Sequence, residues 1–450
     1  MNKDKSITVR RYILKMAIPA IAGLSTQMVV SLVDTSMVGR LNEAEYALAA
    51  MGLGVLATWA LISFFSSLAT GTHVMVARRF GAGNYEGCGS VLNSSLILTA
   101  AIGIVIGFIG VSSAYSISHF FAADERVGDY AGQFLYYRFM GIPFFLITVS
   151  YRGFFFGIGK IKVFMYSGLI VNLLNIIFNY FLIFGNWGIP RMGVAGSGLG
   201  STLATVCESL FYLCVTFYPA YRKKFNYFKD FRFNKEIVNS IFRISLPVSL
   251  QNVFLLVGFL SFVAITGLIG TAQQAASQVV ISSLFISLMP CFGFGIAVQT
   301  LVGNNLGSHK INLARIYALE TSKIATYYTL FIGVIFIVFP RIILNLLTTD
   351  TKVIETAVPA LRIAGFAQIF YATGIVLANG LQAAGKTLFV MLSEVLTNWV
   401  LFIPLAYLFG VYLKFGLMGA WSALPFYVLT YSAIIYFSFR GGKWTKFKNL

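Results

Sequence analysis

The chain has 450 residues, of which 58% are hydrophobic and only 11% are charged, and its formal net charge is +18. Soluble domains carry about 25% charged residues, so this composition excludes a water-soluble fold. A basic excess is also typical of nucleic-acid-binding proteins, but the Lys and Arg residues are spread over many short loops and form no single patch. We therefore expect an integral membrane protein that binds no nucleic acid.

Apolar segments long enough to cross a bilayer recur along the whole chain. A spanning helix needs about 20 mostly apolar residues, and such segments occur on both sides of the polar stretch Tyr221–Glu236. In chain order, the twelve predicted helices are residues 13–38, 48–75, 88–115, 128–156, 161–185, 193–219, 238–268, 272–302, 312–340, 353–384, 387–410 and 416–439. The sequence thus predicts an all-α integral membrane protein with twelve transmembrane helices.

The first six helices and the last six repeat one another. The matching runs include Ile18-Pro19 with Leu246-Pro247, Gly39 with Gly267, and Gly159-Lys160 with Gly385-Lys386. Repeats with an even number of spans share one orientation and are related by an axis along the membrane normal. We predict two six-helix lobes, residues 1–226 and 227–450, related by such a pseudo-two-fold axis. A substrate cavity is expected between them, with Asn172, Gln251 and Tyr371 as candidate lining residues.

Basic residues gather on one side of the predicted bundle, and short cytoplasmic loops are the ones that retain positive charge. That side holds both termini, and its basic residues include Arg10, Arg11, Arg78, Arg79, Lys160, Lys162, Lys229, Arg232, Lys310, Arg315, Lys386, Arg440, Lys446 and Lys448. Both termini are therefore predicted to be cytoplasmic, as an even helix count requires. Anionic lipid headgroups then account for the net charge.

One run, Gly380 to Thr387, fits the phosphate-loop pattern G-x-x-x-x-G-K-[ST]. That loop needs a strand before it and a helix after it in a soluble α/β domain, whereas apolar helices flank this run. We interpret it as a helix end followed by a cytoplasmic lysine, so no ATP-driven mechanism is indicated.

Ionisable side chains inside the predicted helices are the main functional candidates, because one near a helix centre costs about 2.5–3.5 kcal/mol on insertion scales. They are Asp34, Arg138, Glu208, Glu320, Arg362 and Glu394. Glu320, Arg362 and Glu394 fall where solvation at a helix end or snorkelling can satisfy a charge. Asp34 differs, since at about 1.5 Å per residue it lies roughly 30 Å along the first helix, in the outer half of the span.

Polar side chains of two further helices reach a similar depth. Asn172, Asn175 and Asn179 share one face of the fifth helix, because their spacings are i, i+3 and i+7. Ser201 and Thr202 lie about 12 Å along the sixth helix from its outer end. We expect these groups to converge with Asp34 in the first lobe. Hydrogen bonding between helices is the alternative explanation for the asparagine row.

A carboxylate among neutral oxygens can serve either of two ions. If Arg138 points elsewhere, burial of an uncompensated charge is costly, and Asp34 is then a candidate carrier of a proton. Alternatively, Asp34, Asn175 and Asn179, with Ser201 or Thr202, can hold Na⁺. The residues alone leave both ions open.

At Val33 to Leu41 (VDTSMVGRL) the chain resembles the MATE (multidrug and toxic compound extrusion) family of secondary transporters. The likeness continues through VARRFGAG from Val76, LNIIFNYFLIFG from Leu174, and the segment from Gly193 to Thr205, and it covers nearly the whole length. The resemblance implies a V-shaped pair of six-helix lobes that exports amphipathic, often cationic, compounds in exchange for H⁺ or Na⁺. We also expect a monomer in the plasma (inner) membrane of a prokaryote, in contact with membrane lipids.

Within the family, the site residues resemble those of the DinF-like branch. Asp34 matches its helix-one aspartate and Asn175 its helix-five asparagine, while Ser201 stands where a threonine is usual. Asn179 replaces that branch's helix-five aspartate, which removes a negative charge and argues against Na⁺. The NorM-like branch has acids on helices seven and ten, where this chain has Leu255 and Tyr371. The resemblance thus favours H⁺ at Asp34, with Na⁺ as the alternative, and implies no other cofactor.

Two other functions remain as alternatives. A lipid-linked precursor flippase of the same superfamily needs basic cavity residues for pyrophosphate, and Arg138, Arg152 and Arg362 are the candidates. A membrane enzyme needs a catalytic cluster near the membrane surface, but His73, His119 and His309 are scattered along the chain. We therefore expect a transporter and no enzymatic activity.

Overall fold

The computed structural model describes residues 3–41, 43–228 and 233–445, and all regular secondary structure in these ranges is helical. Eleven of the described helices are long and apolar enough to cross a membrane, and the bent pair α5 (Glu125–Met140) and α6 (Ile142–Gly157) provides a twelfth span. The prediction of an all-α membrane protein with twelve spans is confirmed. Four basic residues used in the topology prediction, Lys229, Arg232, Lys446 and Lys448, lie outside the described ranges.

The helices pack into two compact units. The first unit comprises residues 22–249, and the second comprises residues 1–21 and 250–450. Two helices, α1 (Lys3–Val38) and α10 (Lys235–Ile269), run from one unit into the other. The two units are defined by how the helices pack. The predicted lobes, residues 1–226 and 227–450, are defined by the sequence repeat, and their boundary stays a prediction.

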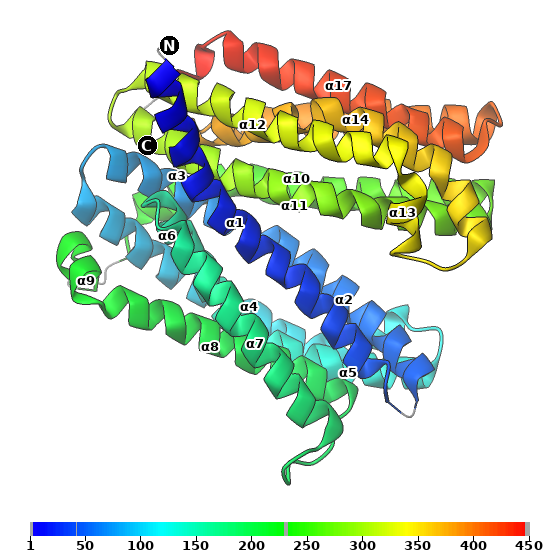
Figure 1. Cartoon of the computed structure of the whole chain (residues 1–450). Coiled ribbons are helices and arrows are strands. Elements are labelled where there is room, and N and C mark those ends of the chain that lie inside the picture. The colour runs from blue at the N-terminus through cyan, green and yellow to red at the C-terminus, as the bar shows by residue number, and fades with distance from the viewer. Residues whose placement is uncertain (1–2, 42, 229–232, 446–450) are drawn as a thin grey trace. The chain divides into compact units, whose positions relative to one another are not determined.

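The first unit contains α2 (Ala44–Ser66), α3 (Leu68–Gly81), α4 (Tyr85–Phe121), α5, α6, α7 (Ile161–Phe184), α8 (Val194–Phe217) and the short α9 (Pro219–Phe225). Helix α4 packs on α5 and α6, and α7 packs along α8 (Figure 1). Small residues allow the closest approaches, since a Cβ added to Gly103 of α4 would lie 2.6 Å from Pro143 Cα of α6.

The fourth predicted helix, residues 128–156, is bent by 48° between α5 and α6. Pro143 in the first turn of α6 has no amide hydrogen to donate, so the regular hydrogen-bond pattern is interrupted there. The amide of Gly141 instead donates to the Arg138 carbonyl at 3.2 Å, in a tighter turn. The sequence predicted one continuous helix because hydropathy gives the length of a span and carries no information on its direction.

The second unit contains α11 (Thr271–Gly307), α12 (Ile311–Val338), α13 (Pro340–Asn345), α14 (Thr351–Ala383), α15 (Thr387–Leu396), α16 (Ile403–Tyr407), α17 (Gly416–Arg440) and a 3₁₀ turn at Lys443–Thr445. Helix α14 packs against α11, α12 and α17, so it is the central helix of this unit (Figure 1).

The eleventh predicted helix, residues 387–410, is interrupted by two π-helical turns, Thr397–Phe402 and Leu408–Tyr412. Pro404 follows the first of them and cannot donate to the carbonyl four residues earlier. The π-helical turn, which is wider than an α-helical one, accommodates the hydrogen bond that is missing at Pro404. Such π-bulges often occur at functional sites.

A buried ion pair joins three helices of the first unit. The Arg152 guanidinium of α6 donates to both carboxylate oxygens of Glu208 on α8, at 2.8 and 3.0 Å. Glu208 is only 3% exposed, and the Ser167 hydroxyl of α7 donates to it at 3.3 Å. Because the two opposite charges compensate each other away from bulk water, we assign this pair a structural role.

Replacing one member of this pair is expected to destabilise the fold. The variant Glu208→Ala leaves the Arg152 charge buried without its carboxylate, a change that costs about 3–5 kcal/mol in other proteins. Thermal unfolding of the purified protein in detergent should show a clear loss, and the double variant Arg152→Leu/Glu208→Leu should recover most of it. The control Glu355→Gln breaks a pair with Arg341 that is 62–67% exposed, and we expect little change. Equal stability of Glu208→Ala and wild type would disprove the structural role.

Candidate functional site

Four predicted site residues form a continuous polar chain across α1, α7 and α8, which we name the Asp34 cluster. The Asn179 side-chain amide donates to Asp34 Oδ1 at 2.8 Å and to Asn175 Oδ1 at 3.3 Å. The Asn175 amide in turn donates to Ser201 Oγ at 3.0 Å. Asp34 is 9% exposed and Asn179 is fully buried. A carboxylate is thus linked through two amides to a hydroxyl, away from bulk water.

Helix geometry explains why these side chains meet. Asn175 and Asn179 are four residues apart on α7, so both face the same side of that helix. Gly200 lets α8 come close to this face, since an added Cβ there would lie 2.1 Å from Asn179 Oδ1. A side chain at position 200 would therefore displace the Asn179 amide from its place beside Asp34.

Two further residues predicted for this site, Thr202 and Asn172, form no hydrogen bond to the Asp34 cluster among the described residues. The Thr202 hydroxyl donates to the Tyr137 backbone carbonyl of α5 at 2.7 Å, so it ties α8 to α5 and does not join the Asp34 cluster. Asn172 is half-buried one turn before Asn175. Its Nδ2 is buried and has no hydrogen-bond acceptor among the described residues.

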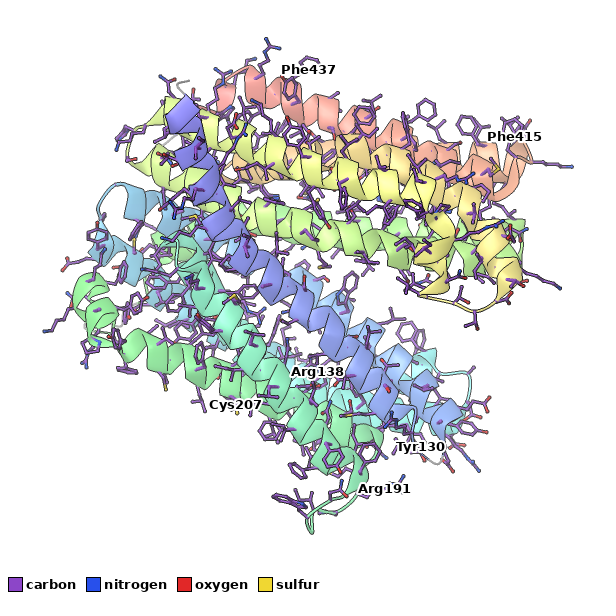
Figure 2. All side chains as sticks on the ribbon, in the orientation of Figure 1. Tyr130, Arg138, Arg191, Cys207, Phe415 and Phe437 are labelled. Carbon is purple, nitrogen blue, oxygen red and sulfur yellow. The ribbon has the colours of Figure 1, made fainter. Side chains whose placement is uncertain are left out.

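Arg138 of α5 is the basic residue whose charge bears on the Asp34 cluster. Figure 2 labels Arg138, which is half-buried in the last turn of α5. Its positive charge lies within electrostatic range of the Asp34 carboxylate. The negative charge of Asp34 is partly compensated before any ion binds.

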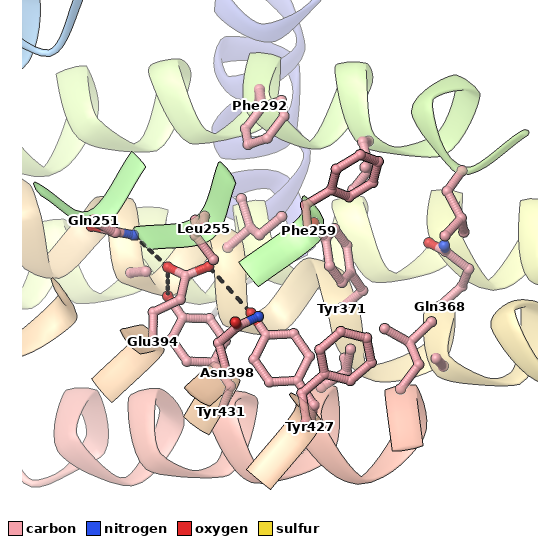
Figure 3. Close-up of a pocket in the computed structure, with 18 of the residues that line it drawn as sticks. Gln251, Leu255, Phe259, Phe292, Gln368, Tyr371, Glu394, Asn398, Tyr427 and Tyr431 are labelled. Carbon is pink, nitrogen blue, oxygen red and sulfur yellow. Dashed lines mark hydrogen bonds between the residues drawn. The ribbon is translucent and has the colours of Figure 1, made fainter. Parts of the chain in front are cut away.

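The second unit encloses a cavity of about 340 Å³ (Figure 3). It is lined by α10, α11, α14, α15 and α17, and by the π-helical turn Thr397–Phe402 that follows α15. The sequence predicts that Asn172, Gln251 and Tyr371 line a cavity between the lobes. Gln251 and Tyr371 line the cavity inside the second unit, whereas Asn172 does not line it. Its walls are mostly aliphatic and aromatic, and include Leu255, Phe259, Phe262, Ile281, Leu284, Phe285, Leu288, Phe292, Ile375, Phe402, Trp421, Leu424, Tyr427, Val428 and Tyr431.

Glu394 of α15 lies at one end of this cavity. The Gln251 side-chain amide and the Tyr431 hydroxyl, the latter at 3.0 Å, both donate to its Oε2, and the Tyr427 hydroxyl lies 3.5 Å from Oε1. Among the described residues that line the cavity, Glu394 is the only one with a charged side chain.

The sequence analysis placed Glu394 near a helix end, where water can solvate it, and this interpretation is wrong. The carboxylate is instead held by side chains of α10 and α17. Tyr427 and Tyr431 are four residues apart on one helix, and this spacing together with an intramembrane acid and Gln251 is the signal that could have revealed the site.

The other two ionisable residues with an uncertain assignment lie outside the cavity. Glu320 is buried in the third turn of α12 and accepts from Arg10 at 3.1 Å and from Lys323 at 2.9 Å. Two cations thus compensate its charge where solvation at a helix end was expected. Arg362 is exposed. Within the described ranges, no group of three or more His, Cys, Asp or Glu side chains could hold a metal ion.

Comparison with known proteins agrees with this architecture. The family model MatE matches residues 19–181 and 247–408, once in each half of the chain. A protein named "Probable multidrug resistance protein NorM" from Thermotoga maritima is 25% identical over 99% of this chain and 95% of its own length. "Probable multidrug resistance protein YoeA" from Bacillus subtilis is 23% identical over 94% of this chain and 92% of its own length.

A solved structure, described as a crystal structure of MATE in complex with MaL6, superposes with a TM-score of 0.89 at 22% identity. The superposition covers 96% of each chain, so the fold is shared from end to end. The predicted family is confirmed, whereas the DinF-like branch stays a prediction. Because the family model covers well over half of the chain, in two successive blocks, this protein belongs to the MatE family of membrane transporters.

Proposed function

We propose that this protein is a secondary active multidrug efflux antiporter that exports amphipathic, often cationic, organic compounds in exchange for H⁺ by alternating access. The observation that carries the proposal is the Asp34 cluster, in which an intramembrane carboxylate accepts a hydrogen bond from Asn179 and is linked through it to Asn175 and Ser201. Relatives that align with nearly the whole chain bear the name of multidrug resistance proteins. Transport of organic compounds is therefore the activity best supported for this chain.

Protonation of Asp34 would change the hydrogen bonds between helices. An ionised carboxylate only accepts hydrogen bonds, whereas the protonated acid has an O–H to donate and needs an acceptor. Each neighbouring amide offers an oxygen as well as an NH₂ group, so Asn175 and Asn179 can serve both states after reorientation. The proton would thus alter the contact between α1 and α7, and this links protonation to helix movement.

Two features of the cluster favour H⁺ over Na⁺. Na⁺ requires several oxygen ligands, whereas the Asn179 and Asn175 amides direct their nitrogen atoms, at 2.8 and 3.0 Å, toward the Asp34 and Ser201 oxygens, so Na⁺ binding would require both amides to turn. The charge of Arg138 acts on the same carboxylate and would repel a second cation. A proton avoids both problems, because it neutralises the carboxylate without needing a coordination shell. Na⁺ remains the competing coupling ion.

We further propose that the protein acts as a monomer in the plasma (inner) membrane of a prokaryote, with both termini in the cytoplasm. The basic residues on the side that holds the termini support this orientation. The proposal includes no enzymatic activity and no cofactor other than the coupling ion.

The lipid-linked precursor flippase is less well supported. Arg152 is engaged by Glu208 and Arg362 is exposed, so two of the three candidate pyrophosphate ligands do not line a described cavity. Arg138 forms no ion pair among the described residues and is not exposed, but it lines no described cavity either. Saturable binding of a lipid pyrophosphate by the purified protein would favour the flippase over the antiporter.

The first transport prediction concerns Asp34. The variant Asp34→Asn keeps the size and the hydrogen-bonding capacity of the side chain but cannot exchange a proton. Export of ethidium from loaded cells should fall close to the level of cells that lack the protein. Glu355→Gln, which alters an exposed acid of α14, should export as wild type does. Unchanged export by Asp34→Asn, at equal amounts of protein in the membrane, would rule out the mechanism.

The coupling ion can be identified in liposomes that contain only the purified protein. Under an imposed pH gradient without Na⁺, we expect ethidium transport in the direction opposite to the proton flow. Under a Na⁺ gradient at uniform pH, we expect no transport above that of protein-free liposomes. The reverse result would assign the coupling to Na⁺.

The residue at position 179 should tune ion selectivity. Asn179→Asp places a second carboxylate 2.8 Å from Asp34 Oδ1 and supplies an oxygen where the wild type has an amide nitrogen. We expect transport by this variant to respond to a Na⁺ gradient. The control Asn179→Leu, which removes the hydrogen bond without adding charge, should transport poorly with either gradient. If Asn179→Asp stays insensitive to Na⁺, the missing carboxylate is not what excludes this ion.

A further inference from the structure

The cavity of the second unit contains a carboxylate that the proposed coupling through Asp34 does not use. Gln251, Tyr427 and Tyr431 orient Glu394 by hydrogen bonds but bring no positive charge. No other charged side chain lines the cavity among the described residues. We propose that this cavity is a binding site for one monovalent organic cation, with Glu394 as its counter-charge.

The size of the cavity matches a small organic molecule. Pockets for such ligands typically measure about 300–1,000 Å³, and this one measures about 340 Å³. A bare metal ion would fill only a small part of that volume. It would also have to displace the amide and hydroxyl hydrogens that Gln251 and Tyr431 already direct at the Glu394 carboxylate. An N–H donor on an organic cation can instead add to these hydrogen bonds.

The walls also suit an organic cation. Tyr427 and Tyr431 are stacked with their ring centroids 6.3 Å apart, and Phe262 meets Trp421 edge to face at 5.1 Å. Aromatic faces attract cations and pack against the flat rings of a ligand. Positive charge near Glu394 would therefore be held both by the carboxylate and by the electron-rich faces of neighbouring rings.

The polar groups are unevenly distributed along the cavity. Figure 3 shows Gln251, Glu394 and Tyr431 at one end, with Phe259 and Tyr371 farther along. At the far end, the Gln368 side-chain oxygen accepts from Ser287 at 2.8 Å, so its amide group is still able to donate a hydrogen bond. This arrangement fits an elongated amphipathic molecule with its cationic group beside Glu394 and its apolar part between the aromatic rings.

The sequence repeat shows that this site is particular to the second half. Aligning Ile18-Pro19 with Leu246-Pro247 places Gly23 opposite Gln251, and aligning Gly159-Lys160 with Gly385-Lys386 places Gly168 opposite Glu394. In the first unit, a Cβ added to Gly168 would lie 3.5 Å from the Gly23 carbonyl oxygen, so α1 and α7 are in close contact there. In the second unit, the same two positions carry the hydrogen-bonded Gln251 and Glu394.

Binding by the purified full-length protein in detergent tests this site, with ethidium as the cationic probe and phenanthridine as its uncharged analogue. Glu394→Gln keeps the shape of the side chain and removes the charge. We expect it to weaken ethidium binding at least about tenfold, and to change phenanthridine binding little. Glu355→Gln, which lies outside the cavity, should bind both probes as wild type does.

A second variant covers the case in which Glu394→Gln does not fold. Leu284→Trp narrows the cavity and leaves the carboxylate in place, so it should weaken the binding of both probes. Wild-type affinity for ethidium in either folded variant, or no ethidium binding by the wild type, would overturn the proposal. No ion gradient is present in this assay, so its outcome is independent of whether Asp34 couples transport to H⁺.

Discussion

An ionised side chain within an apolar helix bundle must be compensated, and this constraint explains the main features of the structure. Three intramembrane acids meet it in different ways. Glu208 is locked to Arg152 by two short hydrogen bonds, and this arrangement holds helices together. Asp34 combines an amide hydrogen bond with the more distant charge of Arg138. Glu394 has neutral donors in its cavity and no neighbouring cation among the residues that line it. When fewer positive charges of the protein itself lie near a buried carboxylate, an ion or a cationic ligand can more readily provide the missing positive charge.

The fold was largely predictable because its dominant signal is simple. A bilayer requires about 20 apolar residues per span, and the chain repeats such segments between short polar breaks. The irregular helices were not predictable in the same way. The bend at Gly141 and the π-turn before Pro404 depend on backbone hydrogen bonds that hydropathy does not describe. Proline marked both places, but it does not determine whether a helix bends, widens or continues straight.

The candidate sites were predictable where they depend on the periodicity of a single helix. The spacing of Asn175 and Asn179 fixes their common face, and the depth estimate brought Ser201 to the same level. Ser201 and Thr202 could not be told apart in this way, because neighbouring helical residues point about 100° from each other and the rotation of α8 was unknown. Glu394 was missed for another reason. Its environment is made by α10, α14 and α17, and distance along its own helix says nothing about a cavity built by others.

The two halves show how one duplicated framework can hold two different polar sites. Asp34 of the first half aligns with Phe262 of the second, which is an apolar wall residue packed against Phe402 and Trp421. Conversely, Glu394 aligns with Gly168, where α7 lies against α1. Glycine at this crossing allows close backbone contact, whereas Gln251 and Glu394 fill the equivalent crossing with polar side chains. Each half thus keeps a single acid in these positions, on opposite members of the same helix pair, and the neighbouring residues differ accordingly. The Asn179 amide contacts Asp34, in keeping with the proposed proton coupling, whereas aromatic rings line the cavity at Glu394, in keeping with the proposed site for a larger cation.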